Sequence, residues 1–174
     1  MWREENRQLF AQCLQGLAQD ETVQRMRAIP QHVKGVSCYD HCVFVAYLSF
    51  TLCRALGLDY RAAARAGLLH DLYLQHWEHT DIGPFRRLIV HPRMALENAR
   101  RFGLSRAERD AIAAHMWPLT LRPPRHAVGW AVCLADKAAA GVEMLHLYRR
   151  LGVEQNVRSL TDLRAASCAG RRKQ

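Results

Sequence analysis

The chain has 174 residues, about the length of one domain, and a chain of this size buries roughly 70% of the surface that it exposes when unfolded. Its formal net charge is +9, from 25 Lys and Arg against 16 Asp and Glu, which favours anionic partners. The basic residues are spread over nearly every segment, so we expect no dedicated nucleic-acid binding. A solvated basic surface with no specific partner is the ordinary interpretation of this spread, with a small phosphorylated substrate as the alternative.

The N-terminal stretch MWREENRQLF is charged and lacks the apolar segment of a signal peptide. The longest apolar run, VFVAYLSFTLC, is too short to cross a bilayer. Six scattered cysteines form no Cys-x-x-Cys pair, a pattern typical of reduced thiols. These features predict a cytoplasmic protein with no membrane attachment, and we expect a monomer or a homodimer.

Apolar residues recur at helical spacing along almost the whole chain, and no strand-like run is flanked by hairpin turns. The sequence therefore predicts an all-α protein, folded as a compact single-domain helical bundle. We expect helices at residues 3–18, 21–29, 37–56, 60–72, 91–102, 105–116, 125–150 and 154–165.

Several local signals mark the ends of these helices. Ser37 can cap the start of its helix, and the tetrapeptide SRAE at 105–108 is a capping box. Residues 73–90 form a long connection that we expect to be irregular, and connections of this length tend to be functional. A second irregular segment, 116–125, contains three prolines that stop a helix.

Some polar residues fall on otherwise apolar helix faces: His41, His70, His115 and Asp136. Asp136 has the most apolar neighbourhood of any carboxylate in the chain, and an unpaired carboxylate there would cost several kcal/mol. Lys137 projects about 100° away around the helix and cannot be assumed to pair with Asp136. A bound metal ion would explain the carboxylate and the histidines together, because both side chains are ligands for divalent ions.

Each of these residues also has an ordinary structural interpretation. A single histidine on an apolar face is more often a hydrogen-bonded core residue than a metal ligand. His91 could simply open a helix before Pro92, and His115 could close one, where the helix dipole favours imidazolium. With Asp71, which directly follows His70, these make six such coincidences in one chain. Six are harder to accept than one, and periodicity alone leaves the metal site and the ordinary interpretation both open.

The order His41, His70-Asp71, His91, His115 and Asp136 resembles that of the HD domain superfamily of metal-dependent phosphohydrolases, over about residues 32–140. The segments that carry the resemblance are SCYDHCVFVAYLS, GLLHDL, HPRMALENA, HMWPL and LADK. The resemblance implies an all-helical HD domain at residues 31–150. Residues 1–30 would be a helical segment packed on its core, and residues 151–174 a C-terminal helix with a basic tail, all within one globular domain.

The resemblance also implies a ligand set. His41, His70, Asp71 and Asp136 match the ligands of a first metal ion, while His91 and His115 match those of a second, with Asp71 bridging the two. Iron or manganese fits this set best, with Zn, Co or Ni as alternatives. The Gly-Tyr-Pro motif of the branch that degrades cyclic di-GMP is missing, which argues against that substrate.

The predicted activity is hydrolysis of a phosphoester or phosphoanhydride, with a nucleotide as the expected substrate. Asp71, His70 and Lys137 are the predicted catalytic residues. Further candidates for substrate contact are Arg86, Arg87, Arg93, Arg122, Arg125, Lys137, His32 and Trp117, with Trp77 as a second aromatic that could stack on a base. Two alternatives stay open: a mixed-valent diiron oxygenase of the same superfamily, and a regulatory module that binds metal and nucleotide without turnover.

Overall fold

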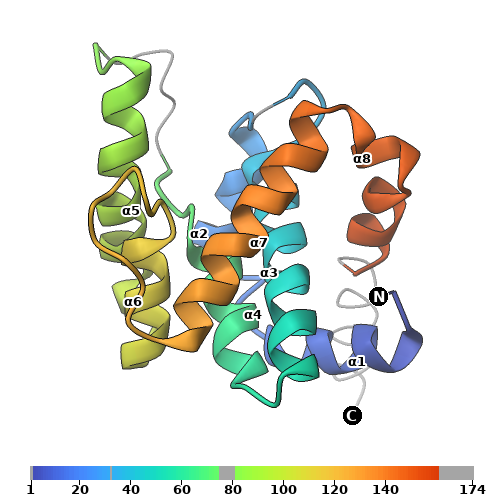
Figure 1. Ribbon diagram of the computed structural model, residues 1–174. Coiled ribbons are helices and arrows are strands. Elements are labelled where there is room, and N and C mark those ends of the chain that lie inside the picture. Colours follow the sequence, from blue (N-terminus) through green and yellow to red (C-terminus); the bar gives the residue numbers. More distant parts are fainter. Residues whose placement is uncertain (1, 32, 75–80, 161–174) are drawn as a thin grey trace.

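A computed structural model describes residues 2–31, 33–74 and 81–160, and the named elements within them are all helical (Figure 1). This confirms the predicted all-α class. The helices are α1 (Glu4–Cys13), α2 (Glu21–Gln24), α3 (Cys38–Ala55), α4 (Tyr60–Leu69), α5 (Pro84–Ala99), α6 (Arg106–Ala114), α7 (Ala127–Met144) and α8 (Leu147–Arg150). Short 3₁₀ turns follow α2 at Arg25–Ala28 and α5 at Arg100–Phe102, and residues 153–160 are helical.

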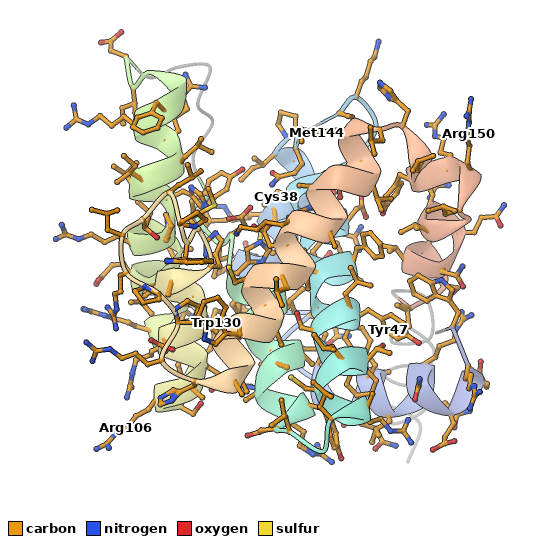
Figure 2. All side chains as sticks on the ribbon, viewed as in Figure 1. Cys38, Tyr47, Arg106, Trp130, Met144 and Arg150 are labelled. Carbon is orange, nitrogen blue, oxygen red and sulfur yellow. The ribbon has the colours of Figure 1, made fainter. Side chains whose placement is uncertain are left out.

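Helix α3 is the centre of the fold. It packs mainly against α4 and α7, and the three helices lie side by side in Figure 1. Its start is set by a capping box in which Ser37 and Asp40 bond to each other's backbone N–H. Large side chains such as Tyr39, Tyr47 and Phe50 are fully buried (Tyr47 is labelled in Figure 2). A polar side chain on this helix, such as His41, therefore lies in the core.

Close approach between α3 and α4 depends on Gly67. A Cβ atom added at Gly67 would lie 2.6 Å from the Cα and 2.9 Å from the backbone nitrogen of Ala46 in α3. Only glycine allows this spacing, and the last turn of α4 follows directly. The contact holds His70, at the C-terminal end of α4, next to α3.

Helices α6 and α7 are joined by a segment that a buried carboxylate organises. Both Arg125 and His126 donate their backbone N–H groups to Asp110 Oδ2, at 2.7 and 3.0 Å. Helix α6 begins with the predicted capping box of Ser105 and Glu108. As predicted, no helix occupies the segment between α6 and α7.

Several helix boundaries differ from the prediction. Helix α1 ends at Cys13 rather than at residue 18, and α4 ends at Leu69 rather than at residue 72. Helix α5 begins at Pro84, well before residue 91, and Pro92 lies inside it. The prediction began this helix at residue 91, beside Pro92, but the proline at the helix start is Pro84. Residues 84–90, which were expected to be irregular, are therefore helical. The predicted helix at 125–150 is divided, because His146 adopts a left-handed conformation, with φ 56°, between α7 and α8.

The N-terminal segment contributes to the same buried cluster as α3, through Phe10 of α1. The five described cysteines are buried and none forms a disulfide, while Cys168, the basic tail and the end of the predicted helix at 154–165 lie outside the described residues. Among the described helices, none combines the length and the apolar character that spanning a membrane would demand.

Candidate metal centre

The fold brings six of the predicted residues together from five elements. All six are buried: His41 in α3, His70 and Asp71 at the end of α4, His91 in α5, His115 at the end of α6, and Asp136 in α7. Within this set, two groups of three place one ligand atom each within 4.8 Å of one another: His41, His70 and Asp71, and then Asp71, His91 and His115. Asp71 belongs to both groups.

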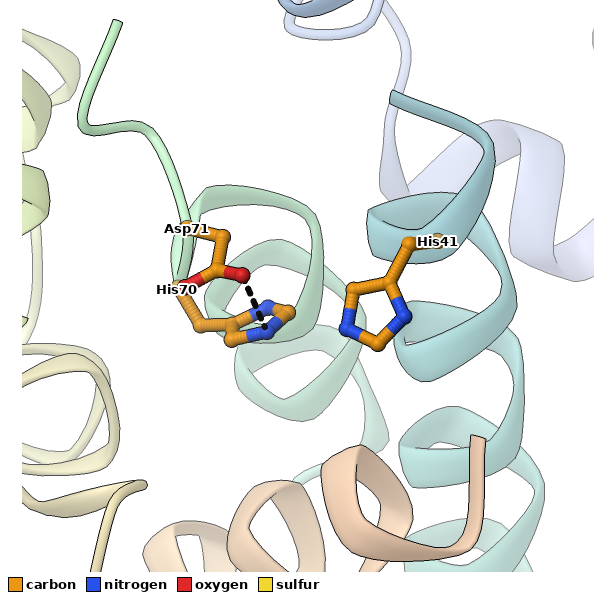
Figure 3. Close-up of side chains that lie close together, drawn as sticks. All are labelled: His41, His70 and Asp71. Carbon is orange, nitrogen blue, oxygen red and sulfur yellow. Dashed lines mark ion pairs between the residues drawn. The ribbon is translucent and has the colours of Figure 1, made fainter. Parts of the chain in front are cut away.

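The first group faces α3 and α7. His41 and His70 point toward each other across the gap between α3 and α4, with Asp71 beside His70 (Figure 3). His70 Nε2 lies 3.7 Å from Asp71 Oδ2. Asp136 Oδ1 lies 3.2 Å from His41 Nε2 and 3.5 Å from His70 Nε2. The Nε2 atoms of both imidazoles therefore face a carboxylate oxygen of Asp136.

The second group faces α5 and α6. Asp71 Oδ1 lies 3.1 Å from His91 Nε2 and 3.5 Å from His115 Nε2. The Nε2 atoms of His91 and His115 are 2.9 Å apart. The two oxygens of Asp71 therefore face different histidines, Oδ2 toward His70 and Oδ1 toward this pair.

Backbone carbonyls determine the tautomer of three histidines. The Nδ1 atoms of His70, His91 and His115 lie 2.8, 2.9 and 2.8 Å from the carbonyl oxygens of Gly67, Arg87 and Ile112. Nδ1 must carry hydrogen to donate to these oxygens, so each neutral ring directs the lone pair of Nε2 into the cluster. This is the orientation of a metal-ligating histidine.

The cluster is incomplete as a hydrogen-bond network. Among the described residues, no hydrogen-bond partner reaches the buried atoms His70 Nε2 and Asp71 Oδ1. In addition, neutral His91 and His115 would place two lone pairs 2.9 Å apart, which only a proton or a metal ion between them can relieve. Nitrogen and carboxylate oxygen donors suit a divalent transition-metal ion, so the residues fit the group that the sequence predicts.

Charges inside the cluster shift several ionisation equilibria in the metal-free protein. Burial alone would raise the pKa of Asp71, but the nearby His70 and His91 hold that pKa well below its usual range. For His41, burial alone would lower the pKa, yet hydrogen bonds to Asp136 and Glu143 raise it well above its ordinary value. The carboxylates therefore stay ionised and available as ligands.

The structure adds three residues that the sequence reasoning missed. Glu143 is fully buried, and its Oε1 lies 2.9 Å from His41 Nδ1. Gln31 donates from Nε2 to Asp71 Oδ2 at 3.0 Å, and the Tyr73 hydroxyl donates to Gln31 Oε1 at 3.1 Å. Glu143 follows Asp136 by seven residues, two helical turns, and this spacing on one face could have identified it. No local signal marks Gln31.

A cavity of about 580 Å³ opens onto the cluster. Its described lining includes Asp71, His91, His115 and Asp136, and the cationic residues among that lining are Arg87 and Lys137. The Lys137 ammonium donates to the backbone carbonyl of His115 at 2.9 Å. One end of the cavity is thus formed by the predicted ligands.

Other predicted substrate residues lie elsewhere. Arg86 and Arg93 are exposed on α5, and neither lines this cavity. An ion pair links Arg122 to Asp110 at 3.6 Å, and exposed Arg125 does not line the cavity. Trp117 packs edge-on against Trp130, with ring centroids 5.0 Å apart, and does not line it either. His32 and Trp77 lie outside the described residues.

Comparison with known proteins agrees with this geometry. The curated protein Ribonuclease Y of Aquifex aeolicus (strain VF5) is 37% identical over 105 residues, which make up 58% of this chain and 16% of that protein. The chain therefore spans less than a fifth of the length of this relative. A sequence model described as the HD domain matches residues 38–141, which is more than half of the chain and includes all six clustered residues.

Members of the HD superfamily are generally metal-dependent phosphohydrolases, and the His and Asp groups of this chain are compatible with a metal site. Both the ordered residues and the length of the matched segment support the assignment. The chain belongs to the HD domain family.

Proposed function

We propose that the chain is a metal-dependent phosphohydrolase with a dinuclear centre. The observation that carries the proposal is the position of Asp71, whose two oxygens face two separate groups of histidines. His41, His70 and Asp136 would hold one ion with Asp71, and His91 and His115 the other. Iron or manganese fits these ligands best, with Zn, Co or Ni as alternatives.

When bound, such ions lower the pKa of water and neutralise the oxygens of a transferring phosphoryl group. The protein's own contribution is orientation. The backbone carbonyls hold three imidazoles in place, Gln31 orients the Asp71 carboxylate, and Glu143 orients His41. Lys137 and Arg87 line the cavity and provide positive charge for a phosphoryl oxygen. We propose a small phosphorylated substrate of the nucleotide class.

The first test combines metal analysis with phosphate release. We expect about two metal ions per chain in freshly purified protein, and anaerobic release of phosphate from a panel of phosphomonoesters and nucleotides. Oxygen uptake without phosphate release would indicate the oxygenase alternative. Tight nucleotide binding with neither reaction would indicate the regulatory module.

Replacing Asp71 by Ala should remove both metal ions and abolish phosphate release with them, because this carboxylate serves both groups. Elemental analysis of the variant measures the first effect, and phosphate release the second. Asp81→Ala is the matched control, since Asp81 is exposed and lies outside the cluster. Full metal content in the Asp71 variant would refute the ligand assignment.

A second candidate substrate comes from the relative that is named as a ribonuclease. The similarity over 105 residues favours a phosphodiester of RNA as an alternative to a small monoester. An RNA oligonucleotide incubated with the metal-loaded protein distinguishes the two. Shortened RNA fragments without release of inorganic phosphate would support the diester.

A further inference from the structure

The cavity above the metal centre has an apolar wall. Its apolar lining residues beyond the ligands are Pro30, Leu88, Met116, Leu119, Ala140 and Met144. Several of them remain accessible: Leu88 is 39% exposed, Leu119 47% and Met144 59%. Figure 2 shows Met144 near the C-terminal end of α7. These side chains are therefore available to contact a ligand in the cavity.

Four of the six wall residues lie on or next to elements that carry the proposed ligands. Ala140 and Met144 follow Asp136 by four and eight residues on α7, and thus share its face. Leu88 precedes His91 by three residues on α5, and Met116 directly follows His115. At 1.5 Å per residue, Met144 lies about 12 Å along α7 from Asp136. The apolar surface therefore extends well beyond the reach of a single phosphoryl group.

The two cationic side chains of the described cavity lining are not part of the apolar wall. Lys137 is adjacent to Asp136 and bonds to the His115 carbonyl, so its ammonium lies beside the metal ligands. Arg87 is the second cation of the described lining. One phosphoryl group carries about two negative charges near neutral pH, and two divalent ions with these side chains can neutralise it. A polyphosphate would extend further charges along the apolar wall, where desolvation would be costly.

We propose, on the basis of the phosphohydrolase function proposed above, that the substrate is a phosphomonoester with a largely apolar alkyl or aryl group. The phosphoryl group lies at the metal centre and the organic group lies against the wall. In the reaction, a water oxygen bonds to phosphorus, the ester P–O bond breaks, and the departing alkoxide takes up a proton. Nucleoside di- and triphosphates are excluded, because their further phosphate charges would lie along the wall.

The experiment measures binding and turnover separately. Ethyl-, butyl- and hexylphosphonate, which lack the hydrolysable ester bond, are titrated anaerobically into the manganese-loaded protein by calorimetry. We expect affinity to rise about two- to fourfold for each added methylene, as burial of apolar surface dictates. Inorganic pyrophosphate should bind more weakly than hexylphosphonate. Equal affinity across the series, or tighter binding of pyrophosphate, would overturn the inference.

Matched variants locate the effect. Leu119→Asp and Met144→Glu place a charge in the wall and should abolish the dependence on chain length while metal content stays unchanged. Leu121→Asp and Leu145→Glu alter neighbouring leucines, 94% and 70% exposed, that do not line the cavity, and should retain the dependence. If all four variants lost the dependence of affinity on chain length, that dependence would not arise from this wall, and the proposal would be contradicted.

Phosphate release from hexyl phosphate distinguishes this inference from the function on which it rests. Release that increases from ethyl to hexyl phosphate supports both. Binding that depends on chain length, without any release of phosphate, would support the apolar ligand class and refute the phosphohydrolase function. Faster release of phosphate from pyrophosphate or nucleoside triphosphates than from hexyl phosphate would support the phosphohydrolase function and refute the apolar ligand class.

Discussion

His41 contacts a carboxylate at each ring nitrogen. Its Nε2 lies 3.2 Å from Asp136 Oδ1 and its Nδ1 lies 2.9 Å from Glu143 Oε1. In the metal-free protein, a protonated ring can donate to both. A metal ion needs the lone pair of Nε2 and would replace that proton, while Nδ1–H would continue to donate to Glu143. Proton and metal ion therefore compete at this residue.

This competition predicts a pH-dependent stability. Burial by itself lowers the pKa of His41 and of His91, but carboxylate contacts raise both above the ordinary value of 6.5. Their ionic contacts stabilise the metal-free fold fully below about pH 6.5 and are lost as pH rises through the raised pKa values. His115, whose pKa burial lowers, titrates on the acid side and does not oppose this trend.

We expect the Tm of metal-free protein to fall from about pH 6.5 upward, while stabilisation by added Mn²⁺ grows over the same range because metal no longer displaces a proton. Thermal scans of both forms at closely spaced pH values measure this. A metal-free Tm that stays constant or rises across this range would contradict the expectation.

Glu143 is a positioning residue by its contacts, because within the described part of the chain His41 is the candidate ligand that it contacts. Glu143→Gln keeps the shape of the side chain and removes its charge. Loss of such a partner typically lowers metal affinity about 10- to 100-fold. We expect that loss, with the helical circular dichroism signal retained. Glu154→Gln is the control, since Glu154 pairs with Arg149 and Arg158 away from the cluster. Unchanged metal affinity in Glu143→Gln would refute the role.

At the scale of helices, the separation of α3 and α4 determines whether His41 and His70 can share an ion. Gly67 permits that separation, and its carbonyl also accepts from His70 Nδ1. The chain then leaves α4 in a tight turn, in which Asn98 of α5 donates to the Leu72 carbonyl at 2.7 Å. These contacts place Asp71 between the two groups of histidines.

Gly67→Ala should destabilise the fold and weaken metal binding together. The added methyl group meets backbone atoms of Ala46, so α4 must move, and such overpacking typically costs about 1–3 kcal/mol. Denaturant unfolding and metal titration measure the two effects. Gly141→Ala is the matched control on α7, where an added Cβ has no neighbour within 4 Å among the described residues, and a mid-helix alanine should stabilise slightly. Equal behaviour of the two variants would refute the role of close packing.

At the scale of the whole molecule, the candidate metal centre brings together residues from five helices or their ends. Its proposed ligands come from α3, the end of α4 and α7 in one group and from α5 and the end of α6 in the other, with Asp71 in both. A bound metal ion would therefore stabilise the packing of all five. The Arg65–Glu108 ion pair, which is part-buried, provides a further link between α4 and α6.

Removing metal should lower the thermal stability of the entire fold. At a metal concentration about 100-fold above Kd, one site adds about 2.7 kcal/mol, and each kcal/mol shifts Tm by about 2–4 °C in a domain of this size. Chelation should therefore lower Tm by at least about 5 °C, and re-addition of Mn²⁺ should restore it. In Asp71→Ala, chelation should change nothing, and a similar shift there would place the effect elsewhere.

The sequence alone determined the helical class, the capped starts at Ser37 and Ser105, and which polar residues lie on apolar faces. Each follows from interactions between residues three or four apart, which any window of sequence contains. The ordered histidines and aspartates also pointed to the HD family. The sequence did not predict the start of α5 correctly, because a proline such as Pro92 usually marks a helix end, whereas here it lies inside the helix.

Only the tertiary structure decided which side chains meet across helices. The sequence predicts that His41 is buried, but its contact with Glu143 depends on the rotation and distance of α7 relative to α3. The ion pair of Arg122 with Asp110 and the position of Leu119 in the apolar wall likewise depend on how the segment between α6 and α7 packs. Such contacts join residues far apart along the chain, and helical periodicity specifies the face of each helix without specifying its partner.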